Sequence, residues 1–235
     1  MTPRSDDFAL DFTAVTAEAE RPMRARIESL VIAGWTGRDL QAVTRHIEEL
    51  ARMGVAPPTT TPIFYRAAAR LLTTAEEIQV VGRDSSGEVE PVLVATADGL
   101  WVGVGSDHTD RKLERVGVTV AKQLCAKPVS ARLWNFEEIQ PHWDQLIVRS
   151  FALLAGRRRL YQQGMLSQLR HPRELMALYR GGEGRLPPGC VMFCGTMAVE
   201  GEIAFADAYE LELEDPVRHL CLNHRYRVQP LPLAG

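Results

Sequence analysis

The chain has 235 residues, of which 46% are hydrophobic and 24% charged, and its formal net charge is −3. This length allows one large domain or two small ones with a sizeable core. The slightly acidic balance gives no electrostatic reason to expect nucleic acid or an anionic membrane as a partner. No apolar run is long enough to cross a bilayer, and the amino terminus lacks a hydrophobic signal core. We therefore expect a cytoplasmic protein.

The amino-terminal quarter predicts two strands, over residues 8–12 and 24–32, followed by a helix over residues 39–53. The helix is indicated by the helical spacing of Leu40, Val43, Ile47 and Leu50 and by the glycine that follows it. Residues 55–61 are rich in proline and threonine and cannot continue it. We interpret them as a linker between a small unit of residues 1–57 and a main body of residues 58–235.

The main body alternates short β-branched runs with turn residues, which is typical of a β-rich domain. Strands are predicted over residues 78–82, 88–94, 100–104, 158–164, 190–194, 205–213 and 220–228, with a strand or short helix over 145–154. Pro172 opens a helix that runs to Tyr179. The predicted fold class is therefore mixed α/β with a β-rich body. The four cysteines, at positions 125, 190, 194 and 221, are interpreted as unpaired structural residues.

Three carboxylates are expected to gather where two of these strands form a hairpin. Glu88 and Glu90 are two residues apart, so on a strand they share a face. The turn at Asp98-Gly99 returns the chain so that Asp107 can lie beside them. Clustered acids in an apolar setting need a counter-charge, which Mg²⁺, Mn²⁺ or Ca²⁺ would supply. The alternative is that the two glutamates are solvated on an edge strand and that the aspartate caps a turn.

His46 and Glu49 are three residues apart on the predicted helix and lie on one face. Such a pair activates water, because the carboxylate fixes the imidazole tautomer while the other ring nitrogen removes a proton. The same face also carries other charged residues, so an exposed polar helix surface is the alternative interpretation. Lys122 also has two interpretations. In its apolar context it is either a surface lysine with a buried stem or an ammonium paired with the carboxylates.

Taken in order, these motifs resemble the fumarylacetoacetate hydrolase superfamily, whose members carry a Glu-x-Glu and Asp metal triad in a rolled β-sheet body. The similarity covers roughly residues 31–228 and runs through the following segments: His46-Ile47-Glu48-Glu49, Pro62-Ile63-Phe64-Tyr65-Arg66, Glu88-Val89-Glu90, Asp107 to Arg111, Ala121-Lys122, Tyr161-Gln162-Gln163-Gly164, and Pro188-Gly189-Cys190-Val191-Met192-Phe193-Cys194-Gly195-Thr196.

The resemblance implies a role for each of these residues. It implies metal ligands at Glu88, Glu90 and Asp107, with Mg²⁺ or Mn²⁺ as the expected cofactor and Ca²⁺ as a further possibility. It implies that the helix with His46 and Glu49 is a mobile lid bearing the catalytic dyad, and that Lys122 stabilises a developing enolate. The substrate-binding residues that it implies are Arg66, Arg111, Gln162 and Thr196.

The implied activity is metal-dependent hydrolysis of a C–C bond in a 2-oxo acid or a 1,3-dicarbonyl such as an acylpyruvate. Decarboxylation, dehydration or tautomerisation of a related keto acid is the alternative on the same site, and a non-catalytic keto-acid-binding protein is a further one. Relatives commonly form homodimers, so the same is expected here. The sequence departs from the family pattern in the short segment between Glu90 and Asp107, in Met197 and in Cys190. These departures alter the substrate side of the site more than the metal side.

Overall fold

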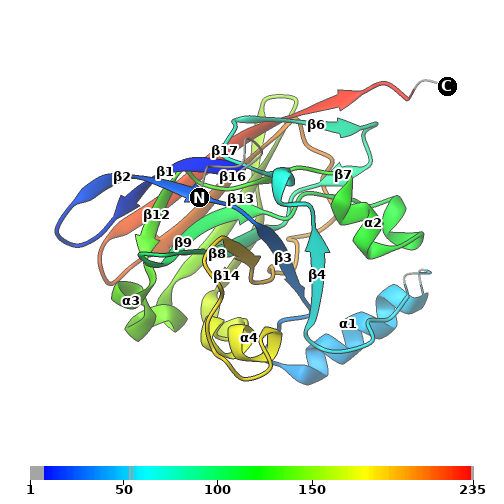
Figure 1. The fold of residues 1–235 in the computed structure, drawn as a ribbon. Helices are drawn as coiled ribbons and strands as arrows, with labels where there is room; N and C mark the ends of the chain where they lie inside the picture. Colours follow the sequence, from blue (N-terminus) through cyan, green and yellow to red (C-terminus); the bar gives the residue numbers. More distant parts are fainter. Residues whose placement is uncertain (1–7, 53, 55, 234–235) are drawn as a thin grey trace.

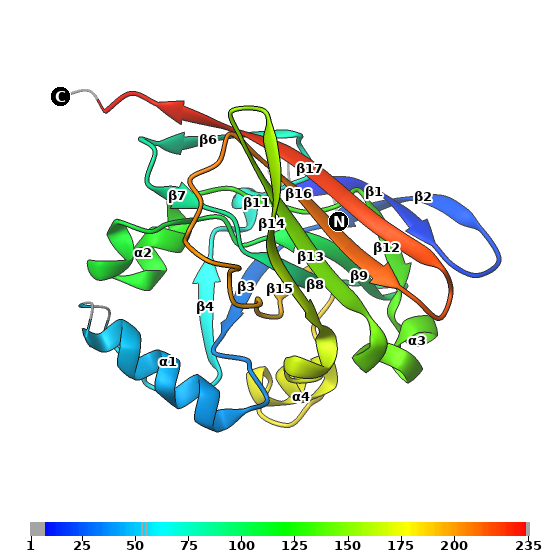
Figure 2. The same cartoon turned by 180° about the vertical axis from the view of Figure 1, so that it is seen from behind.

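The structure is a computed structural model, and it describes residues 8–52, 54 and 56–233. Within this part of the chain, two large β-sheets pack on each other and short helices lie around them (Figure 1, Figure 2). The larger sheet contains β1 (Ala9–Val15), β2 (Glu20–Arg26), β3 (Ser29–Gly34), β4 (Ile63–Ala67), β8 (Val89–Thr96), β9 (Gly99–Ser106), β12 (Arg132–Asn135) and β15 (Cys190–Phe193). The smaller sheet contains β6 (Glu77–Val81), β13 (Ile147–Leu154), β14 (Arg157–Met165), β16 (Ala208–Asp215) and β17 (Leu220–Leu231).

The order of the eight-stranded sheet is β2-β1-β12-β9-β8-β15-β3-β4, and that of the five-stranded sheet is β14-β13-β16-β17-β6. Two small ribbons complete the strands: β5 (Leu72–Thr73) with β11 (Lys127–Pro128), and β7 (Ser85–Ser86) with β10 (Thr109–Asp110). The α-helices are α1 (Leu40–Arg52), α2 (Val118–Gln123), α3 (Phe136–Ile139) and α4 (Pro172–Tyr179). The predicted mixed, β-rich α/β class is confirmed.

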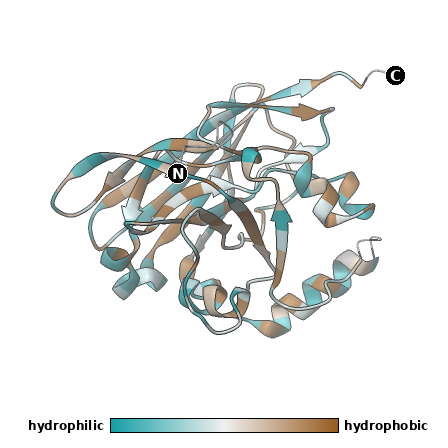
Figure 3. Ribbon diagram, in the orientation of Figure 1, coloured by the Kyte–Doolittle hydropathy of each residue, from teal (hydrophilic) through white to brown (hydrophobic). Residues whose placement is uncertain are grey.

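The central strands of the larger sheet bury both faces. Val89 and Leu93 of β8 join the larger core cluster, whereas Val92 and Val94 join a second cluster on the opposite face. Because side chains alternate along a strand, one apolar run can serve two cores. Figure 3 shows hydrophobic residues along these interior strands. The curled larger sheet therefore holds its middle strands away from water on both sides.

The prediction of one strand over residues 24–32 is wrong. The chain forms two strands, β2 and β3, separated at Ile27 and Glu28. Here the pairing partner changes from β1 to β15: the amide of Ile27 donates to Phe8, whereas that of Glu28 donates to Gly189. The apolar pattern continues across this point, so it did not reveal the break.

At the other end of the chain, the strand predicted from residue 205 begins only at Ala208. The amide of Ala206 donates to the Tyr209 hydroxyl, and that hydroxyl donates to the carbonyl of Ala204. These residues therefore bond to a side chain in place of a neighbouring strand. Residues 147–154, left open between strand and helix, form β13.

The predicted helix is confirmed as α1, although Met53, its expected last residue, lies outside the described residues. Its role as a lid stays a prediction. Asp39 caps its first turn by accepting hydrogen bonds from the amides of Gln41 and Ala42 at 2.9 and 3.0 Å. The apolar stripe is only partly covered, since Leu40 is 56% exposed while Val43 and Ile47 are half-buried. The helix stands beside the body and not within its core (Figure 1).

The strands on both sides of residue 57 share the larger sheet, because β1, β2 and β3 lie in it together with β4, β8 and β15. The domain boundary expected there stays a prediction. All four cysteines are free, as the sequence analysis expected. No helix within the described residues is long and apolar enough to span a membrane.

Candidate metal and active site

The β8–β9 hairpin brings the three predicted carboxylates together. Glu90 on β8 pairs in register with Gly105 on β9, and the amide of Asp107 donates to the carbonyl of Glu88 at 2.9 Å. Glu88, Glu90 and Asp107 each offer one oxygen, and these oxygens all lie within 4.8 Å of one another. Gly105 permits this packing, because a Cβ there would lie 2.7 Å from the carbonyl oxygen of Pro128. The predicted clustering of the acids is therefore present in the fold.

Asp107 is fully buried between two lysines. The ammonium of Lys122, on α2, donates to Oδ2 of Asp107 in a short contact, and Nζ of Lys127 lies 3.1 Å from Oδ1. Burial alone would raise the pKa of Asp107, but the two ammonium groups outweigh it and lower this pKa to about 2. The carboxylates of Asp107 and Glu88 raise the pKa of Lys122 despite the cost of its burial. Lys122 is thus the paired ammonium, not a surface lysine.

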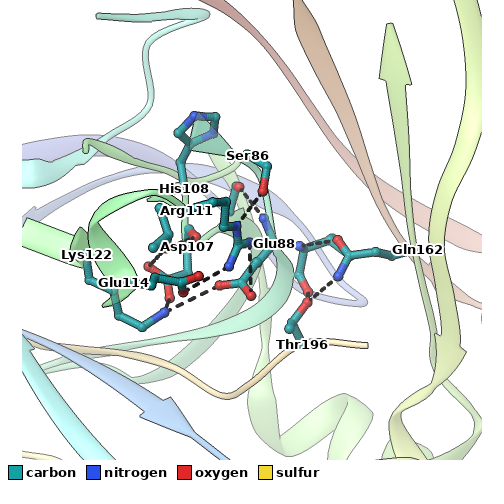
Figure 4. A network of polar contacts seen from close by, with 12 residues as sticks. Ser86, Glu88, Asp107, His108, Arg111, Glu114, Lys122, Gln162 and Thr196 are labelled. Atoms are coloured by element: carbon teal, nitrogen blue, oxygen red, sulfur yellow. Dashed lines mark hydrogen bonds and ion pairs between the residues drawn. The ribbon is translucent and has the colours of Figure 1, made fainter. Parts of the chain in front are cut away.

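Arg111 uses its whole guanidinium group within the protein (Figure 4). Its Nε donates to the Ser86 hydroxyl at 2.6 Å, Nη1 lies 3.1 Å from Glu114, and Nη2 lies 3.1 Å from Oε1 of Glu88. Glu88 also receives Lys122, with Nζ 3.4 Å from its Oε2. The two cations therefore fix the carboxylate of Glu88 from two sides.

Glu90 is the carboxylate of the cluster that has no ion pair among the described residues. It is 2% exposed, and its Oε2 accepts a hydrogen bond from the amide of Gly195 at 2.6 Å. Burial, followed by the charges of Asp107 and Glu88, raises its pKa well above the ordinary carboxyl value. A buried carboxylate repelled by two neighbours is where a divalent cation would be most stabilising, so this donor set fits a hard cation such as Mg²⁺ or Mn²⁺.

Gln162 and Thr196 support the hairpin. The side-chain oxygen of Gln162 accepts from the amide of Val89 at 3.0 Å, and its nitrogen donates to the Thr196 hydroxyl at 2.8 Å. Thr196 in turn donates to the carbonyl of Val89 at 2.8 Å. These contacts tie β14 and the segment after β15 to the backbone between the two glutamates. Their substrate-binding role stays a prediction.

The remaining predicted site residues do not contact the cluster in this structure. His46 and Glu49 pair with each other, Nδ1 to Oε2 at 3.6 Å, and their side chains are 61% and 59% exposed. The ring of His46 also lies 5.6 Å from that of Trp35. Arg66 is exposed on β4 and donates to the Tyr179 hydroxyl at 2.8 Å. Three of the ten predicted residues thus lie apart from the other seven.

Several residues that hold the site together were not predicted from the sequence, namely Ser86, Glu114, Lys127 and Gly195. The spacing between Arg111 and Glu114 was a usable signal, because residues three apart on a helical turn can pair. Lys127 had no such signal, because its burial results from the pairing of β11 with β5. Gly195 was noticed only as part of a motif, although its φ of 101° and its proximity to Thr36 explain the need for glycine.

Two surface hollows lie elsewhere on the molecule. One, of about 360 Å³, is lined by residues that include Arg132, Glu210 and His224, and another, of about 390 Å³, by residues that include Phe8 and Ala68. Neither hollow has a member of the carboxylate cluster in its lining. The cluster is therefore marked by its chemistry and not by these hollows.

Comparison with solved structures relates this fold to known proteins. The chain is similar to a candidate fumarylacetoacetate isomerase/hydrolase from Oleispira antarctica, with a TM-score of 0.65, 17% identity, and coverage of 92% of this chain and 99% of the other. It is similar to yeast ynq8, a fumarylacetoacetate hydrolase family protein (0.62, 16%, 88% and 95%). It is also similar to 2-keto-3-deoxy-D-arabinonate dehydratase complexed with magnesium and 2,5-dioxopentanoate (0.62, 16%, 90% and 77%).

At these identities the likeness shows the fold, which is that of fumarylacetoacetate hydrolase-like proteins. No curated protein matches the chain in sequence. The model of a protein family described as "Protein of unknown function (DUF2848)" matches residues 33–226, which include the carboxylate cluster and the helix with His46 and Glu49. With most of its length matched by that model, the chain belongs to the DUF2848 family.

Proposed function

We propose that this protein is a divalent-metal-dependent hydrolase that cleaves a C–C bond in a 2-oxo acid or a 1,3-dicarbonyl compound. The observation that carries the proposal is the convergence of Glu88, Glu90 and Asp107 within 4.8 Å, with the Lys122 ammonium beside two of them. Three carboxylates are the ligand type that Mg²⁺ and Mn²⁺ prefer. The fold neighbour bound to magnesium and 2,5-dioxopentanoate adds support for a small keto acid as the substrate.

Each residue of the cluster has a role in this proposal. Glu88, Glu90 and Asp107 would hold the cation, which when bound supplies a Lewis acid for the ketone oxygen. Lys122 would stabilise the negative charge of an enolate through a charge-assisted hydrogen bond. Arg111 is assigned to positioning Glu88, because its guanidinium is already occupied by Ser86, Glu88 and Glu114.

Water activation is assigned to His46 and Glu49. Glu49 lies 3.6 Å from Nδ1 of His46, so it would orient the ring and leave Nε2 to take a proton from water. Because both side chains are largely exposed on α1, hydrolysis requires this helix to approach the cluster. The exposure also favours a second candidate, a lyase or tautomerase that uses the cluster and Lys122 without the dyad.

Thermal unfolding with Mg²⁺ or Mn²⁺, and with oxalate as an enolate mimic, tests the metal site. A ligand that binds the folded state alone raises the unfolding midpoint. We expect a rise of about 5 °C or more that needs both metal and oxalate. Glu90→Ala should abolish it, whereas Glu137→Ala, at an exposed acid, should not. No rise with any divalent ion in the wild type would refute the metal site.

Product analysis on acylpyruvates, oxaloacetate and deoxy-keto sugar acids then separates the two candidates. If hydrolysis is the reaction, Glu49→Gln should lower the turnover of acylpyruvates by about 10²- to 10⁴-fold. The same variant should bind metal and oxalate like the wild type. Full turnover in Glu49→Gln would eliminate the dyad mechanism and leave the lyase or tautomerase. A ligand that binds with metal and emerges unchanged would indicate a binding protein.

A further inference from the structure

The cations that contact the carboxylate cluster are all engaged within the protein. Lys122 pairs with Asp107 and Glu88, and Lys127 pairs with Asp107 and donates to the carbonyl of His108. Arg111 is shared among three partners, as described above. Within the described residues, every cationic side chain that a ligand would meet at the cluster therefore already has an acidic partner. A second carboxylate on that ligand would find these cations already paired with Asp107, Glu88 and Glu114.

The wall next to Lys122 is aromatic. Helix α2 packs against β4, and the Nζ of Lys122 lies over the ring of Tyr65, 5.8 Å from its centroid. Tyr65 is half-buried, so part of its surface stays open. Burial raises its pKa, while the neighbouring Trp35 side chain and the charge of Lys122 act in the opposite direction. The phenol therefore stays neutral at physiological pH and offers an uncharged surface.

Trp35 continues this wall toward α1. Its backbone is left-handed, with φ at 60°, which is rare for a bulky side chain. The tryptophan ring lies 5.6 Å from the ring of His46. Tyr65 and Trp35 thus stand in sequence between the ammonium of Lys122 and the imidazole of His46. We call these two residues the aromatic wall.

Arg66 does not supply the missing counter-charge. It follows Tyr65 on β4, and neighbouring residues of a strand point to opposite faces. Its guanidinium donates to the Tyr179 hydroxyl of α4, on the side of β4 where Phe64 stacks on the same tyrosine ring at 5.2 Å. Arg66, the cation next to Tyr65 in the sequence, is therefore engaged with α4 on the other face of β4.

From these contacts we infer that the site selects 2-oxo acids whose distal group is uncharged and packs on the aromatic wall of Tyr65 and Trp35, and that it discriminates against diacids. This inference rests on the proposed function, which supplies the 2-oxo acid end of the ligand. Aromatic rings give apolar contact to such a group, whereas a distal carboxylate would lose water without gaining a partner.

Calorimetric titration in Mg²⁺ with a matched pair of ligands tests the inference. The probes are 2-oxohexanoate and 2-oxohexanedioate, which differ only in a terminal methyl or carboxylate group. We expect the monoacid to bind the wild type about tenfold more tightly than the diacid. Tyr65→Ala should reduce this ratio to about threefold or less, because it removes the apolar surface, and Tyr65→Phe should retain it. Glu137→Ala, at an exposed acid outside the site, should leave the ratio unchanged.

Oxalate, which has no distal group, distinguishes failure of this inference from failure of the proposed function. It should bind the wild type and Tyr65→Ala equally, which would show that the variant is folded and its cluster intact. If oxalate binds but the diacid is equal to or tighter than the monoacid, the aromatic wall does not set specificity and the inference is overturned alone. If oxalate fails to bind the wild type with Mg²⁺, the proposed function falls and this inference falls with it.

Discussion

The carboxylate cluster and helix α1 carry the two halves of the proposed chemistry, and they differ sharply in how the fold holds them. Asp107 has no exposed surface and contacts two lysines, whereas His46 is 61% exposed and contacts Glu49 and Trp35. The cluster is built on neighbouring strands of the core, while α1 lies beside the body (Figure 2). The groups proposed to bind and polarise a keto acid are therefore preorganised, and the groups proposed to deliver water are not.

The fold thus fixes the position of the carboxylates and Lys122, whereas it leaves the position of His46 and Glu49 variable. Preorganised charge is effective because it costs no rearrangement when the substrate reacts. A helix that lies away from the cluster would have to move in each turnover. Substitutions in such a helix can alter the reaction without disturbing the core. Enolate chemistry at the cluster would thus persist in a variant that has lost hydrolysis. If the contrast holds, substitutions in the cluster should change stability more than substitutions on α1.

Lys122→Met should strongly destabilise the metal-free protein. The substitution leaves Asp107 and Glu88 without one of their cations, and breaking a buried ion pair costs about 3–5 kcal/mol. Urea unfolding in the presence of a chelator measures the loss. Saturating Mg²⁺ should recover part of it, because the ion supplies positive charge to the same carboxylates.

The matched control is Lys112→Met, at a lysine whose side chain is 71% exposed and lies 4.0 Å from Asp84. Its cost should stay within about 0.5 kcal/mol. Equal costs for the two lysine variants would mean that the ammonium of Lys122 is not a structural part of the cluster.

Glu90→Gln should change the pH dependence of stability in the metal-free protein. The pKa of Glu90 is raised in the folded state above its ordinary value of 4.5. Its contribution is therefore complete below that value and is lost as pH rises through the folded-state pKa. The variant has no such charge, so its stability relative to the wild type should increase from about pH 4.5 upward.

Urea midpoints measured with a chelator across this range test the sign, and Glu137→Gln, at an exposed acid, serves as the control. Added Mg²⁺ should reverse the order at neutral pH, because only the wild type then gains from the ion. A stability difference that does not change with pH would show that Glu90 is not repelled by its neighbours.

The sequence predicted the cluster well, because its geometry is local. The two-residue spacing of Glu88 and Glu90 and the short turn at Asp98-Gly99 determine which groups face each other across a hairpin. The fold class followed from the same alternation of apolar residues in the strands. The clustering of these acids and the helical nature of residues 40–52 are both confirmed in the structure.

What the sequence left out depends on long-range pairing. Lys127 becomes buried only because β11 joins β5, more than fifty residues earlier in the chain. The break at Ile27 arises because β2 pairs with β1, whereas β3, which follows it, pairs with β15. The exposure of His46 likewise depends on where α1 lies, which helical spacing does not determine. No periodic pattern in one segment records the position of its distant partner.

His46→Ala should have the smallest effect on stability but a large effect on hydrolysis. The imidazole contacts a glutamate that is itself 59% exposed and one tryptophan ring, so its loss should change the free energy of unfolding by no more than about 0.5 kcal/mol. Mg²⁺ and oxalate binding, measured by calorimetry, should equal that of the wild type, while hydrolysis of an acylpyruvate should fall by about 10²- to 10⁴-fold. Arg45→Ala, on the same exposed helix, should change none of these. If His46→Ala weakens oxalate binding, α1 already rests on the cluster in solution, and the contrast between a fixed and a movable half of the site is wrong.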